Sequence, residues 1–263
     1  MNRIDIKFKA LRKAKKKAFI AFITAGDPNL KTTKELVLAF EKAGVDIVEL
    51  GVPFSDPLAD GPTIQSSSQR ALQQHVTLEK IIQLVKDIRR YSEIPIALMT
   101  YYNPVFAMGE AVFVKKAAQA GVDGVIIPDL PPEEGKNLIK LTAAYQLAMV
   151  QFLSPTTTLA RTKRIIQSAS GFIYFVSVTG VTGARTQAPV DFMSHVKKAQ
   201  RLTKKPICVG FGVSTPQQVQ KIAQSADGVI VGSAIINQIL QQKGKKDLVK
   251  NTAQFVRRLT KVL

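Results

Sequence analysis

Eight short apolar runs recur along the whole chain, and this rhythm restricts the fold more than any other feature. Each run is about the length of a β-strand and is rich in Ile, Val or Phe. Most runs are apolar at successive positions, as expected for strands of a parallel sheet that is buried on both faces. The runs are AFIAFIT (18–24), VDIVELG (45–51), PIALMTY (95–101), GVIIPD (124–129), AMVQFL (148–153), FIYFVS (172–177), PICVGFG (206–212) and GVIVGS (228–233).

The segments between these runs have helical periodicity. In TTKELVLAFEKAG, one helical face carries Val37, Leu38 and Phe40, with the charged Glu41 and Lys42 outside it. The segment TLEKIIQLVKDIRR repeats the pattern with apolar residues at Leu78, Ile81, Ile82 and Val85. The sequence therefore predicts helices that alternate with the apolar runs.

Helix boundary signals support this alternation. In STPQQVQKIAQSA, Ser214 and Thr215 are candidate helix caps and Pro216 suits the first helical turn. Gly44 and Gly121 each follow a helical pattern and are expected to end a helix.

Eight strands alternating with helices in 263 residues predict an α/β fold, a single (β/α)8 TIM barrel. We expect one domain over residues 1–263, with an extra N-terminal helix and a short helix after the eighth strand. An open doubly wound sheet is the competing architecture. The first strand is not followed by a G-x-G-x-x-G motif, which weakens that alternative.

The formal net charge of +18 raises the question of a nucleic-acid partner, but the charge is unevenly distributed. Residues 1–17 and 243–263 together carry +13, which leaves +5 for the body of the chain. The sequence lacks aromatic RNA-binding motifs and paired Cys and His residues. We therefore expect two solvated, lysine-rich terminal helices and no nucleic-acid partner, although weak salt-sensitive binding to polyanions stays open.

Several other classes of protein are disfavoured. No apolar run is long enough to span a bilayer, so we expect no membrane association. The single cysteine, Cys208, cannot form an intrachain disulfide, which fits a cytoplasmic protein and a buried structural thiol. Neither His75 nor His195 lies at a strand end, and no cluster has metal-ligand spacing, so we expect no metal site.

Two carboxylates near the end of the second strand are the first candidates for catalysis. In a (β/α)8 barrel the active groups lie at the carboxyl ends of the strands. Glu49 lies inside an apolar run, where an ionised carboxylate is costly to bury, and Asp60 lies in the loop that follows. Such a pair can divide acid and base roles. Each carboxylate also has a purely structural interpretation. Glu49 could pair with a surface cation, and Asp60-Gly61 could form an ordinary turn.

Glycine-rich loops follow the later strands. Those after the seventh and eighth strands contain Gly210, Gly212 and Gly232 beside Ser233, in the serial positions of the common barrel phosphate site. The loop VTGVTGARTQAP after the sixth strand is suited to a mobile lid. The alternative interpretation of the glycines after the seventh and eighth strands is that they form ordinary turns. The alternative for the loop after the sixth strand is an ordinary flexible connection.

The segment ELGVPFSDPLADGPTIQ (49–65) resembles the signature of tryptophan synthase alpha chains. The resemblance extends over the chain, in order, through FITAGDP (22–28), MTYYNPVF (99–106), VTGVTGAR (178–185), GFGVSTPQQV (210–219) and VGSAI (231–235). It implies a lyase that cleaves indole-3-glycerol phosphate into indole and glyceraldehyde 3-phosphate without a cofactor. Indole would pass to a beta subunit, which carries pyridoxal phosphate, in an alpha2-beta2 complex.

The resemblance also implies roles for individual residues. Glu49 matches the acid–base residue, and Asp60 matches the residue that accepts a hydrogen bond from the indole N–H. The remaining matches contact the indole ring, the glycerol phosphate or the beta subunit. The expected substrate contacts are Phe22, Met99, Tyr101, Tyr174, Thr182, Gly183, Phe211, Gly212, Gly232 and Ser233. The expected beta-subunit contacts are Pro53, Asp56 and Asn103, all in loops.

Two other functions stay open on the sequence alone. A stand-alone lyase needs the same catalytic residues, and contact loops can persist without a partner. A barrel that only activates the beta subunit is disfavoured because Glu49 and Asp60 are both present.

Overall fold

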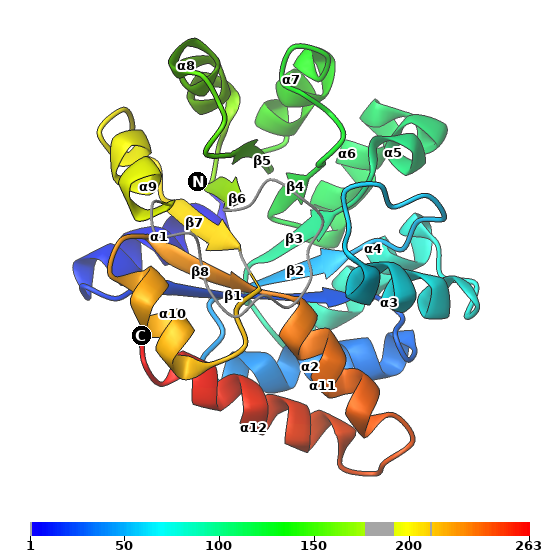
Figure 1. The fold of residues 1–263 in the computed structure, drawn as a ribbon. Coiled ribbons are helices and arrows are strands. Elements are labelled where there is room, and N and C mark those ends of the chain that lie inside the picture. The colour runs from blue at the N-terminus through cyan, green and yellow to red at the C-terminus, as the bar shows by residue number, and fades with distance from the viewer. Residues whose placement is uncertain (1, 177–191, 211) are drawn as a thin grey trace.

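The chain folds into a closed barrel of eight parallel strands, which is surrounded by helices (Figure 1). The computed structural model describes residues 2–176, 192–210 and 212–263. Strands pair in chain order, and the barrel closes where β1 pairs with β8. The predicted (β/α)8 barrel is therefore confirmed, and the open doubly wound sheet is excluded.

Each strand lies within one of the eight apolar runs. Helices cover the outer face of the barrel and side chains fill its interior, so both faces of each strand are buried, which explains why the runs lack a polar side (Figure 1). The strands are β1 (Ala18–Thr24), β2 (Ile47–Gly51), β3 (Ile96–Met99), β4 (Gly124–Ile126), β5 (Ala148–Leu153), β6 (Ile173–Val176), β7 (Ile207–Gly210) and β8 (Gly228–Val231).

The described residues contain helices between all successive strands and at both ends of the chain. They are α1 (Arg3–Lys13), α2 (Leu30–Lys42), α3 (Pro62–Leu72), α4 (Leu78–Ile88), α5 (Tyr102–Met108), α6 (Glu110–Ala120), α7 (Lys136–Ala144), α8 (Leu159–Ser168), α9 (Phe192–Gln200), α10 (Pro216–Ala223), α11 (Ser233–Gln242) and α12 (Leu248–Thr260). The expected N-terminal helix is α1, and the short helix after the eighth strand is α11.

The helical faces follow the predicted periodicity with one shift. In α4 all four predicted residues are buried, together with Leu84 and Ile88. In α2, Val37 and Phe40 are buried as predicted, but the third apolar contact to the core is Leu36, while Leu38 is only partly buried. The face of α2 is therefore rotated slightly from the predicted one.

The predicted helix boundaries are confirmed. Thr215 caps α10 in a reciprocal capping box with Gln218, and Pro216 occupies the first turn. Gly44 and Gly121 follow α2 and α6 with φ of +91° and +88°, a backbone region that a side chain would strain.

Helix α1 closes the amino-terminal end of the barrel. Its residues Ile4 and Phe8 are buried in the same apolar cluster as the strand residues Ile20 and Ile47 and as Phe172, which precedes β6. The rings of Phe8 and Phe172 lie 5.9 Å apart. The lysine-rich N-terminal helix thus packs an apolar face into the barrel. Its Lys and Arg residues lie on the other faces of the helix.

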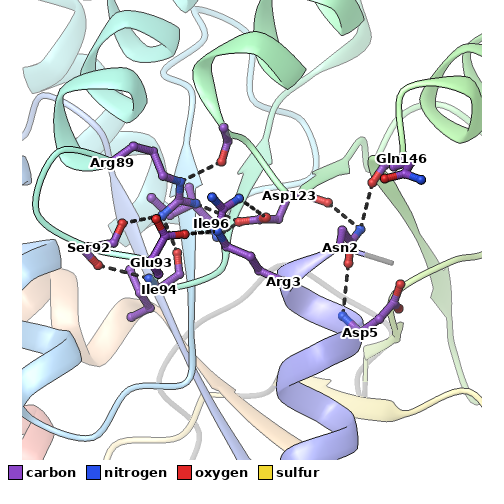
Figure 2. A network of polar contacts seen from close by, with 11 residues as sticks. Asn2, Arg3, Asp5, Arg89, Ser92, Glu93, Ile94, Ile96, Asp123 and Gln146 are labelled. Carbon is purple, nitrogen blue, oxygen red and sulfur yellow. Dashed lines mark hydrogen bonds and ion pairs between the residues drawn. The ribbon is translucent and has the colours of Figure 1, made fainter.

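A polar network holds α1 at this end (Figure 2). Asp123, which precedes β4, is 2% exposed and accepts hydrogen bonds from Arg3 at 3.1 Å and from Arg89 at 2.7 Å. It also accepts the backbone N–H of Ile96 at 2.9 Å. The Asn2 side chain donates to the Asp123 carbonyl. The buried carboxylate of Asp123 is therefore fully paired. It lies at the amino-terminal end of the barrel, opposite the strand ends where we expect the functional site.

Helix α12 packs beside α2 and α11 on the outside of the barrel (Figure 1). Its buried residues include Val256 and Leu259, while Arg257 and Arg258 lie in its last turn. The two basic termini are therefore amphipathic helices, as expected. Within the described ranges, no helix is both long and apolar enough to cross a membrane.

Candidate active site

A cavity of about 460 Å³ opens at the carboxyl ends of the strands. Its walls are mainly apolar, with polar groups at a few positions, as is usual for small-molecule sites. The lining residues are Phe22, Leu58, Ala59, Asp60, Ile64, Met99, Pro128, Phe152, Tyr174, Val176, Gly210, Gly212, Val213, Ile230, Gly232 and Ser233.

Glu49 lies within the barrel beside this cavity. It pairs in register with Phe22 on β1 and Ala97 on β3, and its side chain is completely buried. Neither carboxyl oxygen has a hydrogen-bond partner among the described residues. Burial raises the pKa of Glu49 to about 8, because the charged form loses its hydration without compensation. The surface ion pair considered for Glu49 is therefore wrong.

Asp60 lies on the cavity wall and is held by Tyr101. The Tyr101 hydroxyl donates to Asp60 Oδ2 at 3.1 Å and accepts the backbone N–H of Ala59 at 2.9 Å. Burial raises the pKa of Asp60 to about 6, and the Tyr101 hydrogen bond opposes that rise. At pH 7, these pKa values leave Asp60 mostly ionised and Glu49 mostly protonated, so the two carboxyl groups differ in charge.

Tyr174 lies near both carboxyl groups. It lines the cavity from β6, and its ring lies 4.9 Å from that of Phe152 on β5. Its pKa is raised well above the ordinary value, first by burial and then by the nearby charges of Glu49 and Asp60. Both carboxyl groups therefore lie close enough to Tyr174 for their ionised forms to affect its pKa.

Two glycines leave room for the aromatic side chains of the cavity. A Cβ added at Gly51 would lie 2.6 Å from Phe22 Cζ, so the Phe22 ring crosses β2 only because residue 51 has no side chain. A Cβ added at Gly210 would lie 2.4 Å from the Tyr174 hydroxyl. Glycine at these positions is required by close contact with a ring.

Another part of the cavity wall is formed by the loops after β7 and β8. Gly232 and Ser233 line it where α11 begins, and Gly212 lines it after β7. The first backbone N–H groups of a helix have no acceptor within the helix and favour a bound anion. The sequence had predicted that these loops form a phosphate site; they do line the cavity, and phosphate binding stays a prediction.

Most of the predicted contact residues meet at this cavity. Phe22, Met99, Tyr174, Gly212, Gly232 and Ser233 line it, and Tyr101 lies behind Asp60. Three further predicted contacts, Thr182, Gly183 and Phe211, lie outside the described residues, as does the predicted lid. Phe152 lines the cavity but was not predicted to do so. Its position near the end of an apolar run was the one sequence signal that could have indicated it.

The three predicted partner contacts lie near the mouth of the barrel. Asp56 and Asn103 are exposed, whereas Pro53 is buried within the chain. Asn103 was expected in a loop but lies in the first turn of α5. The helix begins there because Tyr101 takes the extended N-cap conformation and Asp129 accepts the N–H of Tyr102.

The histidines and the cysteine lie as expected. His75 is exposed in the connection after α3, His195 belongs to α9, and Cys208 is buried in the barrel interior. In the part of the chain that the structure describes, no group of three His, Cys, Asp or Glu side chains is arranged to hold a metal ion.

Comparison with known proteins gives a consistent result. The family model described as tryptophan synthase alpha chain matches residues 8–263. The chain is 52% identical over 246 residues to the tryptophan synthase alpha chain of Geotalea daltonii, covering 94% of this chain and 93% of that one. It is 45% identical over 263 residues to that of Thermoanaerobacter sp. strain X514, covering all of both chains.

A solved structure agrees with the sequence relatives. The crystal structure of tryptophan synthase subunit alpha from Legionella pneumophila superposes with a TM-score of 0.92 at 35% identity, covering 100% of this chain and 98% of that chain. A family match over nearly the whole length, a full-length relative and the same barrel therefore coincide. The chain belongs to the tryptophan synthase alpha chain family.

Proposed function

We propose that the cavity cleaves indole-3-glycerol phosphate to indole and glyceraldehyde 3-phosphate, with Glu49 as the proton-transfer residue and Asp60 as the partner of the indole nitrogen. The observation that carries this assignment is the separation of the two pKa values, to about 8 for Glu49 and about 6 for Asp60. Membership of the tryptophan synthase alpha chain family supports this lyase activity.

The chemistry requires a proton at indole C3. Protonation of C3 gives an indolenine-like cation, and the bond between C3 and the glycerol carbon then breaks. Its electron pair returns to the ring, while the hydroxyl on that carbon gives its proton to the Glu49 carboxylate formed in the first step and the carbon becomes the aldehyde. A protonated Glu49 suits the first step, and an ionised Asp60 stabilises the positive charge that grows at the ring nitrogen.

Substrate orientation follows from the chemical character of the walls. Phe22, Met99 and Phe152 give the indole ring an apolar environment. The phosphate is assigned to the loops at Gly212, Gly232 and Ser233, where helix α11 begins. We assign Thr182, Gly183 and Phe211 to the same site from the family resemblance alone.

Glu49 is buried beside the cavity and is not one of its lining residues. Protonation of the substrate therefore requires the carboxyl group to rotate into the cavity when substrate is bound. An unpaired carboxyl has no hydrogen bond to lose on leaving its buried position, so this rotation is inexpensive.

A beta subunit is the partner implied by the family, and we propose an alpha2-beta2 assembly in the cytoplasm. Asp56 and Asn103 are exposed near the barrel mouth. Leu58 and Phe106, which lie close to them in sequence, are 90% and 67% exposed, and exposed large apolar side chains favour a protein partner. We assign Pro53, which is buried, to the support of this loop. Pyridoxal phosphate would belong to the beta subunit.

We also propose that residues 1–263 act as one domain without a nucleic-acid or membrane partner. The decisive experiment measures indole release from indole-3-glycerol phosphate, with and without the beta subunit. We expect slow cleavage by the chain alone and faster cleavage in the complex. An unchanged rate over a wide range of beta concentration would indicate a stand-alone lyase, and no cleavage in either condition would contradict the proposal.

A further inference from the structure

The carboxylate of Asp27 ties the loop after β1 to helix α3. Asp27 is 4% exposed and accepts a hydrogen bond from Ser67 Oγ at 2.6 Å. Arg70 approaches the same carboxylate with two nitrogens, Nε at 3.0 Å and Nη2 at 2.6 Å. Ser67 and Arg70 lie three residues apart in α3, so both contacts come from one face of the helix.

Helix α3 packs beside β1 and α11 but buries only small side chains there. Its buried residues are Ser67, Ser68 and Ala71, all of them small. Helix α4, which has the same length, buries six apolar side chains. Since packing of large apolar side chains normally holds a barrel helix in place, the contact with Asp27 is the main specific constraint on α3.

The position of α3 determines the position of Asp60. The helix begins at Pro62, two residues after Asp60. The Gln65 side chain donates to the Asp60 carbonyl at 2.8 Å, which makes the Asp60 backbone an extension of the first turn. A shift of α3 would therefore move the Asp60 carboxyl away from the Tyr101 hydroxyl.

We propose that Asp27 is a positioning residue for catalysis, which acts through Arg70, Ser67 and helix α3 to hold Asp60 against Tyr101. This inference rests on the proposed function and adds a residue to which that function assigns no role. Asp27 does not line the cavity, so it exerts its effect without touching the substrate.

The test compares Asp27→Asn with a matched control at the other end of the barrel. The Asp123–Arg89 pair is equally close, at 2.7 Å against 2.6 Å, and equally buried, with carboxylates 2% and 4% exposed. Both Asp27→Asn and Asp123→Asn remove the charge from a buried ion pair. Cleavage is measured well below the unfolding temperature of each variant.

We expect Asp27→Asn to lower kcat by about tenfold to a hundredfold, since a misplacement near 1 Å has effects of that size. KM should change less than about threefold, because no group that we assign to substrate binding is removed. Asp123→Asn should leave kcat within about twofold of the parent, although both variants unfold more easily.

A double-substitution experiment separates positioning from general loosening. If Asp27 acts by holding Asp60 against Tyr101, then Asp27→Asn combined with Tyr101→Phe should cost less than the product of the two single effects. Asp123→Asn combined with Tyr101→Phe should give the simple product. A kcat for Asp27→Asn within twofold of the parent, or a simple product with Tyr101→Phe, overturns the inference.

If Asp27→Asn does not fold, Arg70→Lys provides the same test. Lysine keeps the charge but loses the two-nitrogen contact, so kcat should still fall about tenfold. An unchanged kcat for this variant also overturns the inference. Failure of the parent to release indole would instead contradict the proposed function, so the two results are distinguishable.

Discussion

The hydroxyl of Tyr101 lies 3.1 Å from Oδ2 of Asp60 and donates a hydrogen bond to it. This bond favours the ionised form of Asp60 and opposes the effect of burial on its pKa. Tyr101, which lies behind Asp60, therefore helps to set both the direction and the charge of the carboxylate that we assign to the indole nitrogen.

Removal of this hydroxyl should weaken catalysis at low pH. In Tyr101→Phe, the pKa of Asp60 should rise above about 6, so the acidic limb of the kcat profile should move to higher pH. Loss of one charge-assisted hydrogen bond should lower kcat about tenfold at neutral pH. The control is Tyr102→Phe, which removes a hydroxyl bonded to Glu110 outside the cavity. An acidic limb that stays in place would contradict this role for Tyr101.

The buried carboxyl of Glu49 should make folding stability depend on pH. Its pKa is raised from 4.5 to about 8 in the folded chain, so the fold favours the protonated form. That stabilising contribution is complete below about pH 4.5 and is lost as the pH rises to about 8. Between these limits the parent should lose about 1.4 kcal/mol per pH unit relative to Glu49→Gln.

Urea unfolding of the parent and of Glu49→Gln, at several pH values across this window, measures the difference. The control is Glu134→Gln, which changes an exposed glutamate. Parallel stability curves for the parent and Glu49→Gln would show that Glu49 titrates normally in the folded protein.

A side chain at position 210 should disable the site with only a modest effect on stability. In Gly210→Ala the new methyl group would lie 2.4 Å from the Tyr174 hydroxyl, so the ring must move. We expect kcat/KM to fall at least about a hundredfold because the cavity loses its arrangement. Gly135→Ala places a methyl 3.1 Å from Leu130, outside the cavity, and should retain activity. Equal activity of the two variants would exclude a role for the Tyr174 position.

The phosphate end should respond to changes at Ser233. In Ser233→Ala one hydroxyl donor at the start of α11 is lost, and KM should rise about threefold to tenfold with little change in kcat. The matched control is Ser168→Ala, whose hydroxyl bonds the Ile165 carbonyl at the end of α8. Steady-state kinetics with indole-3-glycerol phosphate measures both variants. An unchanged KM for Ser233→Ala would remove this residue from the phosphate site.

The barrel could be predicted from sequence because its signals are local. Each strand is a short apolar run, and each helix has a repeating face or a recognisable cap such as Thr215. The apolar surroundings of Glu49 were also visible in VDIVELG, although its complete burial was not. The resemblance to the family then added the distinct roles of Glu49 and Asp60.

The supporting contacts could not be predicted because they join distant parts of the chain. Asp27 meets Arg70 across 43 residues, and Tyr101 meets Asp60 across 41. Neither pair has a sequence spacing that marks it, since the barrel closure brings the loops together. Phe152 was missed for a similar reason: whether a strand residue faces the cavity depends on the barrel and not on its own neighbours.

The most direct test of the account is the rate of indole release from indole-3-glycerol phosphate by the parent and by Glu49→Gln. Glutamine has a similar shape and cannot deliver the proton, so the variant should be at least about a thousandfold slower while still binding the substrate. Cleavage by Glu49→Gln at the parental rate would contradict the central claim that Glu49 transfers the proton.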